Sequence, residues 1–86
     1  MKVVVKEIEM IAWFKKLEMP IPIKFTILDR EQKKVVKVNE IIHTNVEKLA
    51  GNKMYIYRCQ SMIEDKEIIY ELKYEVDQCK WYLFKI

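Results

Sequence analysis

Apolar and polar residues alternate along most of this chain, which is the two-residue period of a β-strand and not the period of a helix. The alternation is clearest near the end of the chain, where Ile68, Tyr70, Leu72, Tyr74 and Val76 fall on one face and the polar Glu71, Lys73 and Glu75 on the other. β-Branched and aromatic residues are frequent throughout, as strands with one buried face prefer. The pattern predicts six strands, over residues 3–14, 21–28, 33–42, 54–63, 67–75 and 80–86.

Polar or conformationally restricted residues separate these strands. Pro20 and Pro22 predict a bend, because neither can donate a hydrogen bond to a ladder. The polar segment 29–32 predicts a hairpin, and the segments 64–66 and 76–79 predict tight reversals. The longest irregular stretch covers residues 45–53. There we expect one short helical turn near 45–50, ended by Gly51 in a left-handed conformation.

The last two hairpins are regular enough to predict their register. A final turn centred on residues 77–78 places Tyr74 opposite Trp81, and a preceding turn centred on residues 65–66 places Cys59 opposite Leu72. One face then carries residues suited to a core, namely Tyr57, Cys59, Ile63, Ile68, Tyr70, Leu72, Tyr74, Trp81 and Leu83. The other face is mixed, with the predicted rows Ile56–Glu75–Lys80, Arg58–Lys73–Tyr82 and Gln60–Glu71–Phe84.

An antiparallel meander of about six strands in 86 residues cannot stay flat, because twisted sheets of this size close on themselves or fold face to face. We therefore expect a single all-β domain over residues 1–86, either a small barrel or a strongly bent sheet. The last strand is apolar on both faces owing to Tyr82, Phe84 and Ile86. We expect the first strand, the segment 45–53 or a second copy of the chain to cover it.

Composition and charge narrow the functional classes. The 16 basic and 13 acidic residues give a net charge of +3, which does not require a polyanionic partner. Lys and Ile are abundant and only two arginines occur, a bias typical of an AT-rich bacterial genome, so the lysines are weak support for nucleic-acid binding. Gly51 is the only glycine, which excludes a glycine-rich phosphate loop or a dinucleotide fingerprint. No apolar run reaches the roughly 18 residues of a membrane helix and no signal-peptide pattern opens the chain, so we expect no membrane partner.

A few residues could carry chemistry, and each has a simpler interpretation. In the predicted register Cys59 and Cys79 are about 16 Å apart, beyond the roughly 7 Å limit of a disulfide, so free thiols and a cytoplasmic location are expected. His43 is the only histidine and is interpreted as a surface loop residue. Glu7 and Glu9 have the spacing of two carboxylates that flank a bond, but this spacing also suits a charged edge strand, which we favour. We expect no catalytic residue, metal or cofactor; a pocket lined by Glu7, Glu9 and His43 would indicate an enzyme.

The order Pro22-x-x-Phe25, residues 35–41, Tyr70-Glu71-Leu72-x-Tyr74 and Lys80-Trp81-x-Leu83 resembles small uncharacterised bacterial domains. Those domains share a proline before the second strand and an ending of the form Y-E-L-x-Y followed by R/K-W-x-L. The resemblance covers most of the chain and implies the fold. It implies no activity or site, because the matching residues are core and turn positions. The apolar Val76 and Cys79 of the final turn depart from the family's polar pattern there.

We interpret the chain as a non-enzymatic cytoplasmic binding domain whose partner is a protein, with a homodimer as the first expectation. The apolar last strand and the apolar fraction of 51% favour self-association, through residues 3–5 and the C-terminal edge, by strand addition or face packing. The candidate contact residues on the mixed face are Arg58, Lys73, Tyr82 and Phe84. The alternative is a small barrel that binds single-stranded nucleic acid, because the Arg58–Lys73–Tyr82 row and the lysines of 33–37 combine cations with an exposed ring.

Overall fold

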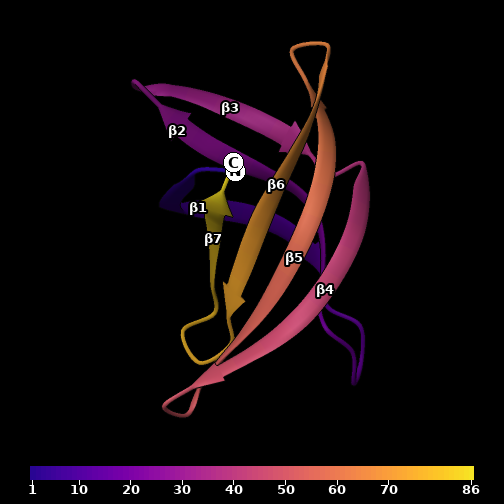
Figure 1. Ribbon diagram of the computed structural model, residues 1–86, viewed down its shortest axis with the longest axis vertical. Coiled ribbons are helices and arrows are strands. Elements are labelled where there is room, and N and C mark those ends of the chain that lie inside the picture. Colours follow the sequence, from indigo (N-terminus) through magenta and orange to yellow (C-terminus); the bar gives the residue numbers. More distant parts are fainter.

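The structure is a computed structural model that describes all 86 residues apart from the side chain of Asp29. Seven strands account for most of the chain, and the described residues form no helix (Figure 1). The strands are β1 (Val3–Trp13), β2 (Ile21–Asp29), β3 (Gln32–Lys37), β4 (Glu40–Leu49), β5 (Asn52–Ile63), β6 (Lys66–Glu75) and β7 (Lys80–Lys85). The all-β prediction is therefore confirmed.

The count of six strands and the helical turn near 45–50 are wrong. The stretch predicted as irregular is the second half of β4 and the start of β5, joined by a two-residue turn at Ala50 and Gly51. Both turn residues have positive φ, 51° and 82°, which is the geometry that matches the twist of a tight hairpin. The predicted strand 33–42 is divided into β3 and β4, because the chain changes partners at Val38 and Asn39.

The strand order in the sheet is β3-β2-β1-β7-β6-β5-β4, so the two ends of the chain meet in its middle. β1 pairs with β7 from Val3 to Ile8 and with β2 from Glu9 to Trp13. Reciprocal backbone hydrogen bonds of 2.7 and 2.9 Å join Lys2 to Ile86. The first strand therefore lies beside the last in the sheet, while Tyr82 and Phe84 stay partly exposed on its outer face. β7 is not a sheet edge, because it lies between β1 and β6. Residues 3–5 of β1 pair with β7 on one side only, since β2 pairs with residues 9–13, so the predicted contact through residues 3–5 stays a prediction.

The sheet is strongly bent, and the predicted barrel is wrong because β3 and β4 remain separate edges. Figure 1 shows the β1–β3 arm crossing behind the β4–β7 arm, so that the two arms face each other. At one corner Val38 N–H donates to the Ile23 carbonyl (2.8 Å) and Asn39 N–H donates to the Gln60 carbonyl (3.1 Å). Residues 38–39 therefore connect β3, which pairs with β2, to β4, which pairs with β5. Closure into a barrel would need β3 and β4 to pair with each other.

The register of the final hairpin is as predicted, with Tyr74 opposite Trp81. The preceding hairpin differs by two residues: Cys59 lies opposite Tyr70, because the turn consists of residues 64 and 65, both with positive φ. A shift of two keeps every side chain on its predicted face. The predicted core face is accordingly buried or packed against the core, and the other arm adds Ile8, Phe25 and Val36.

A buried polar group fixes the two arms to each other. The Ser61 hydroxyl donates to the Lys37 carbonyl (2.6 Å), and it shares a second hydrogen bond of 2.6 Å with the Tyr70 hydroxyl. The Tyr57 hydroxyl likewise donates to the Pro20 carbonyl (2.6 Å). Because buried polar atoms are costly unless paired, these bonds specify how the β1–β3 arm sits on β5 and β6.

Candidate functional site

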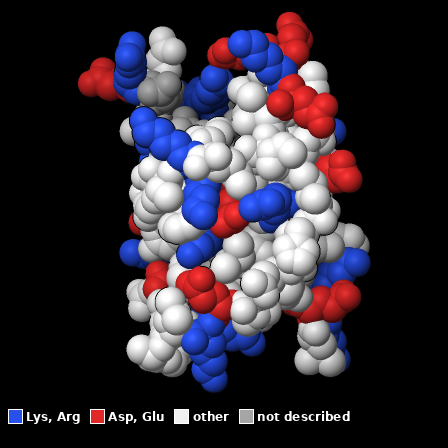
Figure 2. Space-filling view, viewed as in Figure 1, with Lys and Arg blue, Asp and Glu red and all other residues white. Residues whose placement is uncertain are grey.

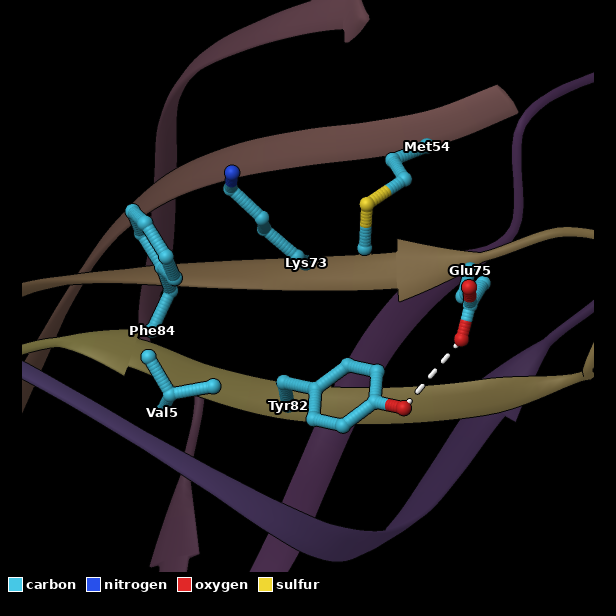
Figure 3. Close-up of a pocket in the computed structure, with 6 residues that line it drawn as sticks. All are labelled: Val5, Met54, Lys73, Glu75, Tyr82 and Phe84. Carbon is cyan, nitrogen blue, oxygen red and sulfur yellow. Dashed lines mark hydrogen bonds between the residues drawn. The ribbon is translucent and has the colours of Figure 1, made fainter. Parts of the chain in front are cut away.

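A shallow depression of about 270 Å³ lies on the outer face of the β4–β7 arm (Figure 3). Tyr82 and Phe84 point into it because their neighbours in the strand, Trp81 and Leu83, point into the core. Val5 joins them at an irregularity in the β1–β7 register, where its φ is 45°. The complete lining is Val5, Met54, Lys73, Glu75, Tyr82 and Phe84.

The charged groups around this depression are already paired within the chain. The Lys73 ammonium lies 3.8 Å from the centroid of the Phe84 ring and 3.6 Å from a carboxylate oxygen of Glu47. Glu75 accepts hydrogen bonds from the Tyr82 hydroxyl (3.2 Å) and from Asn52 (2.9 Å). Partial burial, together with the Glu75 carboxylate, raises the pKa of Tyr82. Paired charges over an apolar floor suit a binding surface better than a reaction centre.

The predicted row Arg58–Lys73–Tyr82 does not exist. The two-residue shift places Arg58 opposite Glu71, 3.4 Å away, while Lys73 lies between Ile56 and Tyr82. The structure therefore brings Lys73, Tyr82 and Phe84 together and leaves Arg58 outside the depression. Cations alternate with carboxylates across this face, and Figure 2 shows blue and red side chains interspersed within a largely uncharged middle.

The residues considered for catalysis are dispersed. Glu7 and Glu9 line an open cavity of about 510 Å³ between β1 and the start of β7, together with the exposed thiol of Cys79. His43 lies on β4 opposite Arg58, at the other end of the strand order, and does not line this cavity. Cys59 is free and fully buried, and burial raises the pKa of its thiol to about 12. Within the described residues, no group of three or more His, Cys, Asp or Glu could hold a metal ion.

The edge strand β4 provides a second candidate surface, which the sequence did not reveal. Its backbone pairs with β5 and with no other strand in the described part of the chain. Leu49 and Asn52 close the two-residue turn, so hydrogen-bonded pairs alternate from there along β4. The backbone N–H and C=O groups of Thr44, Val46 and Lys48 therefore point away from β5, toward solvent.

The contact at Val46 agrees with this alternation. Its N–H does not donate to β5 and donates instead to the side-chain oxygen of the adjacent Asn45 (2.9 Å). The Val46 side chain is 49% exposed on the inner side of the sheet, opposite Tyr55. The other edge, β3, is shorter, carries three lysines and approaches β5, and its Lys34 pairs with Glu64 of the β5–β6 turn (2.8 Å). Short, lysine-rich edges resist strand addition, so β4 is the more accessible edge.

No known family model, curated protein or solved structure matches this chain. The resemblance to small bacterial domains therefore stays a prediction, as does the contact role of Arg58, Lys73, Tyr82 and Phe84. The chain has no described helix with the length and apolar character needed to cross a membrane. Functional interpretation therefore depends on the two surfaces described above, the outer depression and the β4 edge.

Proposed function

We propose that this protein is a binding domain that acts through protein–protein contacts, and that its first partner is a second copy of itself, added strand to strand at β4. The observation that carries the proposal is the regular, outward-facing backbone of Thr44, Val46 and Lys48 on a strand whose backbone pairs with β5 alone. Strand edges that lack a neighbouring strand are templates for another strand.

Charge and register favour one arrangement of the two copies. An antiparallel pair with Val46 opposite Val46 also places Thr44 opposite Lys48 and Asn45 opposite Glu47, so no like charges face each other. Shifting the two strands to place Glu47 or Lys48 opposite its own copy would oppose like charges. The favoured register uses all three outward positions of each strand, and its two-fold symmetry makes the contact close on itself.

The side chains on the inner side of β4 add apolar contact to this arrangement. Val46 of each copy would meet the other across the two-fold axis, beside Tyr55 of each copy. The contact is nevertheless small, because one strand pair buries less than the 1,200 Å² or so of a standard interface. We therefore expect a dimer that forms at tens of micromolar and dissociates on dilution, with little dependence on salt.

Two proline variants test the edge directly. Val46→Pro removes an N–H that takes no part in the β4–β5 ladder, so the fold is expected to persist while the dimer is lost. Val35→Pro is the matched control, because Val35 is exposed and occupies the equivalent outward position on β3. Sedimentation velocity should show a dimer for the native chain and Val35→Pro, and a monomer for Val46→Pro. A monomeric native chain at 100 µM or so, or a dimer that survives Val46→Pro, would refute the proposal.

A nucleic-acid partner has no specific observation in its favour. Arg58, Lys73 and Lys34 each contact a carboxylate, at 3.4, 3.6 and 2.8 Å. A phosphate would have to displace those carboxylates, and the single-sign groove typical of single-strand binders is missing from the described outer face. An oligonucleotide added at low salt in the same sedimentation experiment is expected to leave the mass unchanged.

A further inference from the structure

The loop between β1 and β2 presents the most exposed large apolar side chain of the described residues, Leu17, next to two exposed aromatic rings. Leu17 is 96% exposed, and Trp13 and Phe14, at the end of β1, are 56% and 59% exposed. The backbone of Leu17 has a φ of 63°, a left-handed conformation that a leucine adopts at a cost. Because the Leu17 side chain is almost fully solvated, it buries no apolar surface in the core that would offset this backbone strain.

Basic side chains surround this apolar tip. Lys15 and Lys16 lie between Phe14 and Leu17, and the Lys15 ammonium is 4.3 Å from the centroid of the Trp13 ring. Glu18 is the only acidic residue of the loop. This combination is typical of a segment that anchors a protein at a membrane interface: it has aromatic rings, a protruding leucine and lysines with long aliphatic stems.

We propose that the loop of residues 13–18 docks this protein on an anionic lipid surface, with Leu17 inserted among the acyl chains and Lys15 and Lys16 at the headgroups. The expectation of no membrane partner rested on the lack of a long apolar run, and that argument excludes a span but not contact with one leaflet.

The shape of the tip favours a bilayer over a protein partner. A standard protein contact buries about 800 Å² on each side, whereas this loop presents three exposed apolar side chains, of which Phe14 also packs against Tyr74 at 5.7 Å between ring centroids. Figure 1 shows the β1–β2 loop at the same end of the molecule as the β4–β5 turn, where Leu49 is 65% exposed beside Lys48. At that end of Figure 2, uncharged and basic side chains protrude. A flat anionic surface could contact both apolar tips at once.

Binding to vesicles provides the test. The native chain is expected to co-sediment with vesicles of phosphatidylserine and phosphatidylcholine, and far less with phosphatidylcholine alone. Leu17→Asp should lower the affinity at least about tenfold without affecting the fold, because the side chain makes no core contact. Replacing Lys15 and Lys16 together by Ala should lower it about 25-fold, roughly fivefold for each lysine.

The matched control is Leu28→Asp. Leu28 is 66% exposed but lies beside the β2–β3 turn, at the opposite end of the molecule (Figure 1), so its replacement should leave vesicle binding unchanged. Lipids brominated in the acyl chains should quench the fluorescence of the exposed Trp13, and Trp13→Phe should abolish most of that quenching, because Trp81 is buried. Failure of the native chain to bind anionic vesicles, or equal binding by Leu17→Asp, would overturn the proposal. A soluble protein that captures the native loop while vesicles do not would also overturn it.

Discussion

The buried hydroxyl of Ser61 is the polar contact on which the packing of the two arms depends most. Ser61 and Tyr70 have no solvent-exposed surface, and Ser61 bonds both to Tyr70 and to the Lys37 carbonyl of the other arm. Ser61→Ala removes two hydrogen bonds of about 1 kcal/mol each and leaves the tyrosine hydroxyl buried without a partner. The expected loss in the free energy of unfolding is about 3 kcal/mol.

Tyr70→Phe is expected to cost much less, about 1 kcal/mol. Ser61 can still donate to Lys37 in this variant, and the ring keeps its edge contact with Phe25, at 5.6 Å between centroids. In the double variant Ser61→Ala/Tyr70→Phe no hydroxyl is stranded, so the expected cost is about 2.5 kcal/mol, less than the sum of the two single costs.

Urea unfolding followed by tryptophan fluorescence measures all four proteins on one scale, because extrapolation to water gives the free energy of unfolding. Tyr82→Phe is the control: it removes a tyrosine hydroxyl bond of 3.2 Å at the partly exposed outer face and should cost less than about 0.5 kcal/mol. The reasoning fails if Ser61→Ala costs no more than Tyr70→Phe, or if the two costs add in the double variant.

Three further predictions concern ionisation, turns and thiols. Burial raises the pKa of Cys59 and of Tyr70 to about 12, so the unfolded chain releases these protons at lower pH than the folded chain does. The free energy of unfolding should therefore fall as pH rises above about 9 to 10, by about 1.4 kcal/mol per pH unit for each group. A flat unfolding free energy between pH 9 and 11 would contradict this. Gly51→Ala should lower the free energy of unfolding by about 1 kcal/mol in urea unfolding, because the φ of 82° strains an alanine even though the added methyl has open space around it. Ala50→Asn should raise it by about 0.5 kcal/mol, because asparagine tolerates positive φ in this type of turn. A change of the same sign in both variants would contradict this account of the turn. A maleimide should label Cys79 alone in the folded protein, and mass spectrometry showing two labels per chain without urea would mean that Cys59 is accessible.

Strand faces could be predicted from the sequence because alternation is a local property. The core face of β5, β6 and β7 follows from it, and so does the shared outward direction of Lys73, Tyr82 and Phe84. Alternation does not determine which polar residues form a turn. Residues 64–65 and 65–66 are both polar pairs, and the choice between them decided whether Arg58 would face Lys73 or Glu71.

The parts that could not be predicted depend on long-range pairing or on the absence of a neighbour. The pairing of β1 with β7 joins the two ends of the chain, and no local pattern encodes it. The second half of β4 was missed because an edge strand with two largely solvated faces needs no strict alternation, as the sequence Asn45-Val46-Glu47-Lys48-Leu49 illustrates. The structural role of Ser61 was not predicted because it depends on a hydrogen bond to the Lys37 carbonyl, which belongs to the other arm.

Hydrogen exchange of individual amides, measured over a range of protein concentration, tests the proposed β4 edge most directly. In the monomer the N–H groups of Thr44 and Lys48 face solvent and should exchange quickly, and they should become protected as the dimer forms. The amides of Lys33 and Val35, in the equivalent outward positions of β3, should show no dependence on concentration. Concentration-independent exchange at Thr44 and Lys48, or protection that appears at β3 instead, would contradict the assignment of β4 as the binding edge.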